Sequence, residues 1–277
     1  MSSGPAPGKR EKARAAGRVG VQGRGWSRAR KATSCLAILG TWEVVAHSGW
    51  VSPLLLPSIA GVLQEAARMA GNLSLFMHVG HSVYRALVGF LLATVVGVII
   101  GFLMGRFRAA ELALERFFAV TYPVPKISIY PILVFIFGLG NVSKIALIFL
   151  ECVYPMVINT YYGTRAVNPL LFWAARNMGA GPAVIFRRVV IPAAAPHIFS
   201  GIRIAMPIAL VLVVITEMIG SNNGLGYLII YSSASFRSRD MFVGILGIGV
   251  VGFIFDNLLV WARRRLIFWE RETRFVA

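Results

Sequence analysis

The residues of this sequence that could do chemistry are few, and most of them interrupt apolar segments. Six ionisable residues fall within or beside such segments: Glu43, Arg85, Glu151, Arg203, Glu217 and Asp256. A charged side chain at the centre of a bilayer costs about 3 kcal/mol on insertion scales. We therefore expect each of them to face the interior of a helix bundle, to pair with another group, or to lie near a membrane surface.

The sequence patterns typical of catalysis are absent. There is no G-x-x-x-x-G-K-[ST] phosphate loop, no CxxC or HExxH motif, and no arrangement that suggests a Ser-His-Asp or Cys-His site. Cys35 and Cys152 stand alone in apolar surroundings, where a cysteine acts as a small hydrophobic residue. We therefore expect no catalysis, no bound cofactor and no metal site in this polypeptide.

A polar segment, Asn168 to His197, separates two long apolar segments. Its Ala174–Met178 stretch favours helix. Gly179 and Gly181 can adopt positive φ, and Pro182 can occupy the first position of a second helix. The segment is therefore predicted to form a helix, a sharp turn and a second helix.

The same segment offers features of a docking surface. Phe172 and Trp173 could serve as an apolar anchor, and Ala174 and Ala175 are small enough for a partner to come close. The alternative is a plain connection between helices. Connections of about 30 residues are uncommon unless they are functional, which favours the docking interpretation.

The composition indicates an integral membrane protein. Of 277 residues, 57% are hydrophobic and 14% are charged, and the mean hydropathy is +0.72, whereas soluble domains carry about 25% charged residues. The net charge of +17 is concentrated in residues 1–31 and at the ends of apolar segments. This distribution is typical of membrane topology signals and of contact with acidic lipids, and it does not indicate nucleic acid.

Six segments approach the length of about 20 residues that a membrane-spanning helix needs: 33–51, 86–105, 124–140, 143–163, 198–220 and 241–262. They predict an all-α, polytopic membrane protein, and the first is expected to be a retained helix rather than a signal peptide. The distribution of Lys and Arg places both termini in the cytoplasm. Two amphipathic helices are expected beside the spans, 57–70 on the outer surface and 109–120 on the inner one.

The expected domain organisation is simple. Residues 1–31 form a basic, disordered cytoplasmic arm, residues 32–265 form one transmembrane domain with a cytoplasmic loop at 165–197, and residues 266–277 form a cytoplasmic tail. Within the domain, Gly97, Gly101 and Gly105 recur every four residues and predict a helix face that another helix approaches closely. Packing within the chain is favoured over contact with another subunit.

At the polar segment the sequence resembles the permease subunits of bacterial ATP-binding-cassette importers. Their cytoplasmic loop carries Glu-Ala-Ala, a glycine four residues on, and Ile-x-Leu-Pro. The corresponding residues here are Trp173-Ala174-Ala175, Gly179 and Val189–Pro192, with Trp173 in place of the glutamate and Ile191 in place of the leucine. The resemblance implies that this loop docks on an ATPase subunit through Trp173, Ala174, Ala175, Arg176, Gly179, Ala180, Ile191 and Pro192.

The resemblance covers nearly the whole chain, and the sequence is similar to the nitrate, sulfonate and taurine branch of this family. It rests also on Val51–Ser58, Tyr122–Lys126, Tyr130-Pro131, Phe137–Gly140, Tyr154-Pro155, Gly201–Ala205, Thr216–Gly220 and Gly224–Ile229. It implies the type I permease fold and a multi-pass place in the cell inner membrane. The implied partners are a second copy of the chain, ATPase subunits that hold ATP and magnesium, and an extracytoplasmic binding protein. The implied cargo is a small, anionic solute, or alternatively a thiamine precursor or an aromatic acid.

Five polar residues are candidates for the translocation pathway or its outer gate: Glu217, Asn222, Asn223, Arg203 and Glu151. For Glu217 an interhelical hydrogen bond is an equal alternative, and for Glu151 a polar tie between helices is favoured, because an anionic solute would avoid a carboxylate. Glu217 follows Arg203 by 14 residues, about 21 Å along a helix. These two residues are therefore not expected to pair within one chain.

Two other functions remain open at this point. A secondary transporter would run alone on an ion gradient and would show matching halves with broken helices. Pro131, Pro155 and Pro207 are expected to break helices, but no matching halves are found. A membrane scaffold without transport is disfavoured by the organised loop at 221–240.

Overall fold

The computed structural model describes residues 33, 34 and 36–269. They divide into two compact units at Leu63/Gln64, and each unit is described by itself. The predicted arm at 1–31, Cys35 and residues 270–277 of the predicted tail lie outside the described residues. Within the described part every regular element is a helix, which confirms the all-α prediction.

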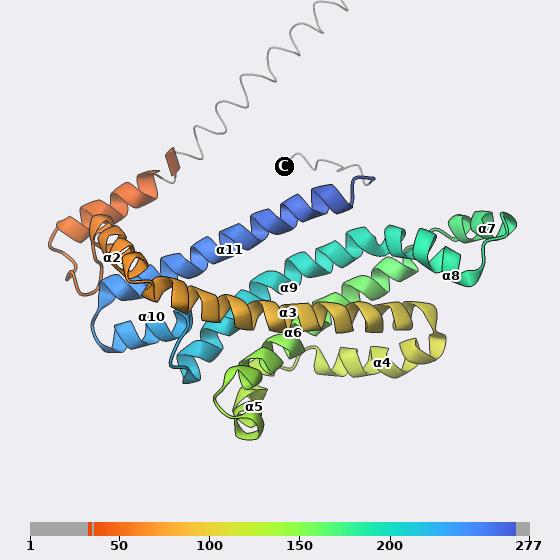
Figure 1. Ribbon diagram of the computed structural model, residues 1–277, viewed down its shortest axis with the longest axis horizontal. Coiled ribbons are helices and arrows are strands. Elements are labelled where there is room, and N and C mark those ends of the chain that lie inside the picture. Colours follow the sequence, from red (N-terminus) through yellow and green to blue (C-terminus); the bar gives the residue numbers. More distant parts are fainter. Residues whose placement is uncertain (1–32, 35, 270–277) are drawn as a thin grey trace, which may run out of the picture. The chain divides into compact units, whose positions relative to one another are not determined.

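Four helices of the second unit are long and apolar enough to cross a membrane (Figure 1). They are α3 (Ser74–Arg106), α6 (Asn141–Arg165), the stretch Pro182–Gly220 that ends in α9 (Ile191–Gly220), and α11 (Ser238–Leu266). They contain the predicted spans at 86–105, 143–163, 198–220 and 241–262. Pro155 and Pro207 lie inside α6 and α9, so the prediction that they break helices was wrong.

The predicted span at 124–140 differs from the structure. A 3₁₀ turn (Lys126–Ile129) and the short α5 (Tyr130–Phe137) follow α4 (Arg108–Thr121), and the two helical parts meet at 86°. Pro131 lies in the first turn of α5 rather than at a break. The bend falls instead at Tyr122–Pro125, where two prolines interrupt the helix. Counted as one span, this bent pair brings the described spans to five instead of the predicted six.

The predicted first span contains only a short helix, Leu36–His47, among the described residues of the first unit. Its Glu43 carboxylate accepts a hydrogen bond of 2.9 Å from the backbone N–H of Ile59, the first residue of α2 (Ile59–Gly71). A carboxylate at this position satisfies an N–H that has no partner within the helix. The charge of Glu43 therefore serves the start of α2, which matches the helix expected at 57–70.

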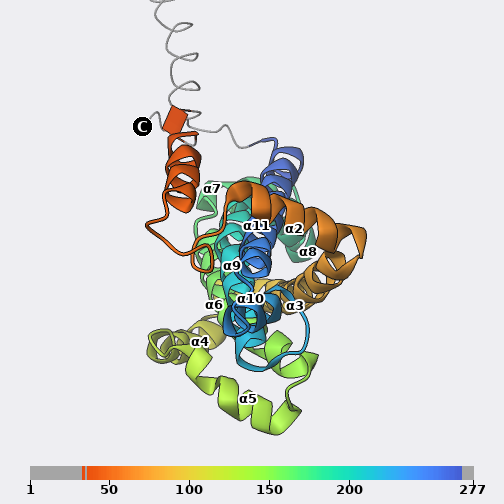
Figure 2. The ribbon, with the colours of Figure 1, turned by 90° about the vertical axis from the view of Figure 1, so that its left-hand side faces the viewer.

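The centre of the second unit is the packing of α3 on α6 and of α6 on α9. In Figure 1, α6 and α9 run alongside each other and α3 crosses them, and Figure 2 views these helices nearly end-on. Gly97, Gly101 and Gly105 face α6. A Cβ atom at Gly101 would lie 2.5 Å from Thr160 Cβ and 2.8 Å from the Val157 carbonyl oxygen. The repeat of small residues thus serves contact within the chain, as predicted, and permits the backbones to approach closely.

Adding one methyl group at this contact should be costly. We expect Gly101→Ala to lower the free energy of unfolding by about 1–3 kcal/mol, the usual cost of overpacking. Gly80 lies on the same helix, and a Cβ atom added there would meet no other atom within 4 Å, so Gly80→Ala should instead raise stability by about 0.5–1 kcal/mol. Thermal unfolding of the two purified variants in detergent measures both, and equal effects would contradict the packing argument.

Candidate functional site

The polar segment 165–197 forms the predicted helix, turn and helix. Its first helix, α7 (Pro169–Asn177), begins at Asn168, whose side chain accepts a 2.9 Å hydrogen bond from the Leu170 N–H. Gly179 has φ +77°, and Pro182 starts α8 (Pro182–Ile185). Gly181 has φ −72°, so the expectation of positive φ holds for Gly179 alone.

The second helix of this segment does not end before the next span. A π-helical turn (Phe186–Val190) joins α8 to α9, which begins at Ile191. Ile191 and Pro192 therefore lie in the first turn of a 30-residue helix rather than in a loop. The helical backbone is therefore continuous from Pro182 to Gly220.

The end of this segment presents apolar side chains to the outside. Trp173 is 61% exposed and Met178 is 80% exposed, and Ala174 and Arg176 are exposed beside them. Only Ala175 is buried, on the inner side of α7. In Figure 1, α7 and α8 lie at one end of the long helices and α10 (Leu225–Ala234) at the other.

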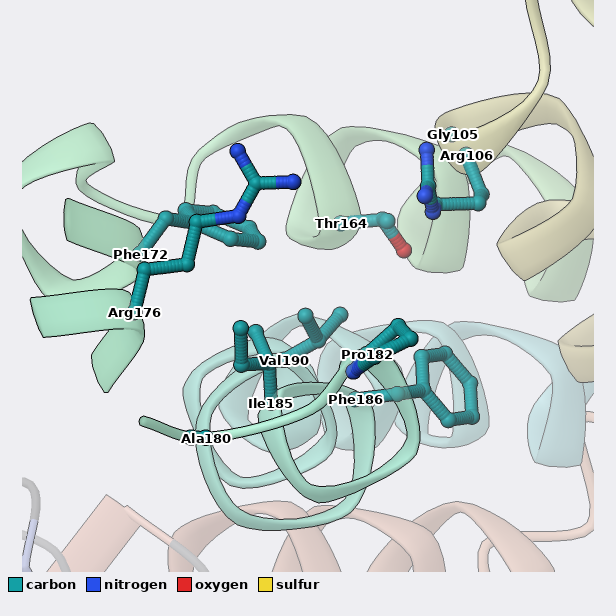
Figure 3. A pocket seen from close by; sticks show the side chains of 10 residues that line it. All are labelled: Gly105, Arg106, Thr164, Phe172, Arg176, Ala180, Pro182, Ile185, Phe186 and Val190. Carbon is teal, nitrogen blue, oxygen red and sulfur yellow. The ribbon is translucent and has the colours of Figure 1, made fainter. Parts of the chain in front are cut away.

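A hollow of about 370 Å³ lies on the inner side of this segment (Figure 3). Phe172 and Arg176 border it from α7, and Ala180 from the turn. Its remaining lining comes from the end of α3, from α6 and from α8 and the following turn: Gly105, Arg106, Thr164, Pro182, Ile185, Phe186 and Val190. The rings of Phe102 and Phe186 are 5.2 Å apart. The segment thus contacts both α3 and α6.

Glu217 is fully buried and bonded to several partners. Its carboxylate forms an ion pair of 2.7 Å with Arg85 and accepts hydrogen bonds from Ser82 Oγ at 2.7 Å and from the Gly226 N–H at 2.9 Å. The Arg85 and Glu217 side chains are 4% and 0% exposed. The interhelical bond that was one of two interpretations of Glu217 is present.

Arg85 extends this cluster to the loop before α10. It donates hydrogen bonds to the carbonyl and side-chain oxygens of Asn223 and to Asn141 Oδ1 at 2.8 Å. The Leu225 N–H donates to Ser82 Oγ at 2.8 Å. Asn223 is therefore part of a structural cluster, while Asn222 is exposed beside it.

Arg203 lies elsewhere. It faces Asp256 of α11 at 3.7 Å, and both side chains are more than half exposed. The structure does not bring Arg203 and Glu217 together, as expected from their spacing. Since the pair is exposed and loose, it contributes little stability.

The Glu151 side chain makes no hydrogen bond and no ion pair with any described residue, so the polar tie between helices that we favoured is not formed among them. It lines a hollow of about 400 Å³ with Lys126, a residue that the sequence analysis did not single out. The signal was present in the sequence, because Lys126 is a charged residue inside the apolar segment 124–140. Arg85 likewise carried a signal as an intramembrane charge, although nothing in the sequence identified Glu217 as its partner.

In the described part of the chain, no group of three or more His, Cys, Asp or Glu side chains is placed to hold a metal ion. Cys152 is a buried free thiol. Its Sγ lies 3.4 Å from the Ala205 carbonyl oxygen, in the contact between α6 and α9.

Comparison with known proteins agrees with this architecture. The family described as "Binding-protein-dependent transport system inner membrane component" matches residues 93–268, which include α6, the helix–turn–helix segment and α9. The chain belongs to this family. It is a multi-pass membrane permease of ABC importers, and its relatives place it in the sulfonate and taurine branch.

Named relatives fall in the same branch. The permease is 34% identical over 235 residues to a Bacillus subtilis (strain 168) permease protein assigned to aliphatic sulfonates transport, covering 85% of each chain. It is 30% identical over 259 residues to the taurine transport system permease protein of Escherichia coli (strain K12), covering 90% of this chain and 94% of that protein. A formylaminopyrimidine transport permease protein of Halalkalibacterium halodurans is 28% identical, with 83% and 94% covered.

A solved structure has the same fold. An inward-facing structure of the MetNI methionine ABC transporter superposes with a TM-score of 0.59 at 18% sequence identity, covering 70% of this chain and 96% of that one. At this identity the likeness shows the fold alone. It supports the type I permease fold.

Proposed function

We propose that the permease is the membrane subunit of an ATP-driven importer that moves a small sulfonate-class solute inward across the inner membrane. A pair of these chains would form the pathway. Separate ATPase subunits would hold ATP and magnesium, an extracytoplasmic binding protein would deliver the solute, and both termini would lie in the cytoplasm. The chain itself would catalyse no reaction.

The exposed end of the helix–turn–helix segment carries this proposal. Trp173 and Met178 form an apolar surface with no cover among the described residues. Exposed aromatic and methionine side chains are typical of a docking surface. Because the segment passes directly into α9 and contacts α3 and α6, a partner bound there could move the long helices.

The departure at Trp173 fits the same proposal. A ring that is 61% exposed can fill an apolar pocket of a partner, which a glutamate could not do at the same position. The ATPase of this system would then present a hydrophobic groove where other systems receive a carboxylate. The family resemblance supports the docking role, and Trp173 gives it an expected chemistry.

The identity of the proposed solute is inferred from the names of the relatives. One of them is named for transport of aliphatic sulfonates, a second for taurine, which is itself a sulfonate, and a third for formylaminopyrimidine. A sulfonate-class solute is therefore the first proposal, and a formylaminopyrimidine-like precursor is the second.

Co-purification tests the docking proposal. The tagged permease, extracted in mild detergent, should retain a soluble protein that has a G-x-x-x-x-G-K-[ST] loop and hydrolyses MgATP. We expect Trp173→Asp to reduce the retained ATPase at least about tenfold, since an anchor residue at an interface contributes about 2 kcal/mol or more.

Ser235→Asp provides the matched control. Ser235 is exposed and directly follows α10. Figure 1 shows α10 at the opposite end of the long helices from α7. This variant should retain the ATPase as the unmodified chain does. Recovery of the chain without any ATPase, or equal loss in both variants, would count against an ABC importer subunit with its docking surface at α7.

A further inference from the structure

The hollow beside Glu151 lies among three parts of the chain. The loop Tyr122–Lys126 forms one wall, α6 contributes Glu151, Tyr154, Pro155, Ile158 and Asn159, and α9 contributes Ile204 and Ile208. Its volume of about 400 Å³ falls within the range of small-molecule sites, about 300–1,000 Å³. All of its lining belongs to the second unit.

Lys126 supplies a buried positive charge to this hollow. The residue is 6% exposed, and its Nζ donates a 2.9 Å hydrogen bond to the Tyr122 carbonyl oxygen. The same Nζ lies 3.9 Å from the centre of the Tyr154 ring, where a cation is favourably placed. An ammonium group has three N–H donors, so capacity remains for an anion. No described carboxylate lies within ion-pair distance of it.

Glu151 supplies a negative charge without a partner. Its side chain is half-buried, on the same hollow, and no described residue donates a hydrogen bond to it. It is the eleventh residue of α6, about 15 Å from the start of that helix at 1.5 Å per residue. This is about half of the hydrocarbon thickness of a bilayer, so Glu151 lies too deep to serve a lipid headgroup.

Near Glu151, α6 also has oxygen atoms that can accept hydrogen bonds. Pro155 has no N–H, so the Glu151 carbonyl lacks its regular helical donor four residues on. Asn159 Nδ2 bonds the Pro155 carbonyl at 2.8 Å, which leaves its Oδ1 without a described partner. Acceptors thus gather on the α6 side of the hollow, and the ammonium of Lys126 lies at the loop side.

Two opposite charges share the hollow without pairing with each other. We propose that it is a substrate subsite for a zwitterionic solute, an aminoalkanesulfonate, whose ammonium group binds Glu151 and Asn159 and whose sulfonate binds Lys126. Tyr122, Tyr154 and Pro155 enclose the short alkyl chain. The assignment rests on the proposed transport function and narrows it. It also removes the conflict between Glu151 and an anionic solute, because the solute brings its own cation.

Three small probes distinguish this site from a site for a simple anion or cation. They are taurine, ethanesulfonate and ethylammonium, which differ only in the charged groups at the ends of two carbons. Binding is measured by saturation-transfer NMR on the purified permease with its ATPase subunits, in lipid nanodiscs without binding protein. We expect taurine to bind about tenfold or more tightly than either single-charge probe, since a hydrogen bond to a charged group is worth about 1.5–3 kcal/mol.

Substitutions of Glu151 and Lys126 test which end of the solute each residue binds. Glu151→Gln should weaken taurine about tenfold and leave ethanesulfonate unchanged, and Lys126→Gln should weaken ethanesulfonate and taurine and leave ethylammonium unchanged. Glu115→Gln removes an exposed carboxylate outside the hollow and should change nothing. Because Lys126 is buried, its substitution also affects packing, so the unfolding temperature of each variant is compared with that of the unmodified permease. The conclusion is drawn from Glu151→Gln, because Glu151 is only half-buried.

The proposal is overturned if ethanesulfonate binds the unmodified permease as tightly as taurine, if no probe binds, or if Glu151→Gln weakens taurine and ethanesulfonate equally. These outcomes are separate from the docking proposal. Retention of the ATPase at Trp173 requires no solute, so a permease that keeps its ATPase and fails with taurine contradicts only the subsite.

Discussion

Replacing Arg85 with methionine should lower the free energy of unfolding of the permease by about 3–5 kcal/mol. The change leaves the Glu217 carboxylate in the interior without its cation. It also removes the donor for both oxygens of Asn223 and for Asn141 Oδ1. Loss of one partner of a buried ion pair costs far more than the pair itself contributes, because the remaining charge stays desolvated.

The position of the pair explains why the loss should spread. Ser82 and Arg85 belong to α3, Glu217 to α9, and Asn223 and Gly226 to the loop and first turn of α10. A single carboxylate therefore connects three elements. Melting of this cluster should release the start of α10 from α3.

A double variant and a surface variant make the experiment specific. Arg85→Met with Glu217→Gln removes the unpaired charge, so it should unfold at a higher temperature than Arg85→Met alone. Arg203→Met removes the exposed pair with Asp256 and should change stability by no more than about 1 kcal/mol. If Arg85→Met unfolds like the unmodified permease, or if the double variant is no better than the single one, Glu217 is not held by Arg85.

The sequence predicted the elements whose signals are local. Hydropathy placed the cores of α3, α6, α9 and α11, and the spacing of Gly97, Gly101 and Gly105 predicted the face of α3 that packs on α6. Gly179 and Pro182 marked the turn and the second helix of the helix–turn–helix segment. Each of these follows from the conformational preferences of the residues themselves.

The differences arise where distant residues satisfy a polar group. The prediction began the second span at residue 86, yet α3 begins at Ser74, because Ser82 and Arg85 find partners more than 130 residues later in the chain. Hydropathy counts such residues as interruptions, since it contains no information on their partners. Hydropathy also contains no information on the surroundings of Glu151, which was expected to tie two helices. That its side chain lies beside Lys126 without a partner among the described residues is visible only in the three-dimensional structure.

Gly179→Val should abolish the stimulation of ATP hydrolysis by transport while leaving the permease in the membrane. Gly179 has φ +77°, a conformation that a β-branched residue adopts only at a cost of about 1–3 kcal/mol. A Cβ at this position would meet no atom within 4 Å, so the cost is conformational rather than steric. The turn should therefore rearrange and misplace α7, while the long helices keep their packing.

Gly181→Val is a control two residues away in the same turn. Gly181 also has no atom within 4 Å of an added Cβ, but its φ is −72° and its ψ is 165°, which valine adopts readily. Both variants add the same side chain to the same exposed turn, so a difference between them measures the backbone requirement alone. Hydrolysis by the reconstituted complex should be uncoupled in the first and normal in the second. Normal coupling of ATP hydrolysis to transport in Gly179→Val would show that coupling does not depend on the backbone conformation of the turn. The contact with the ATPase would then depend on α7 side chains such as Trp173 instead.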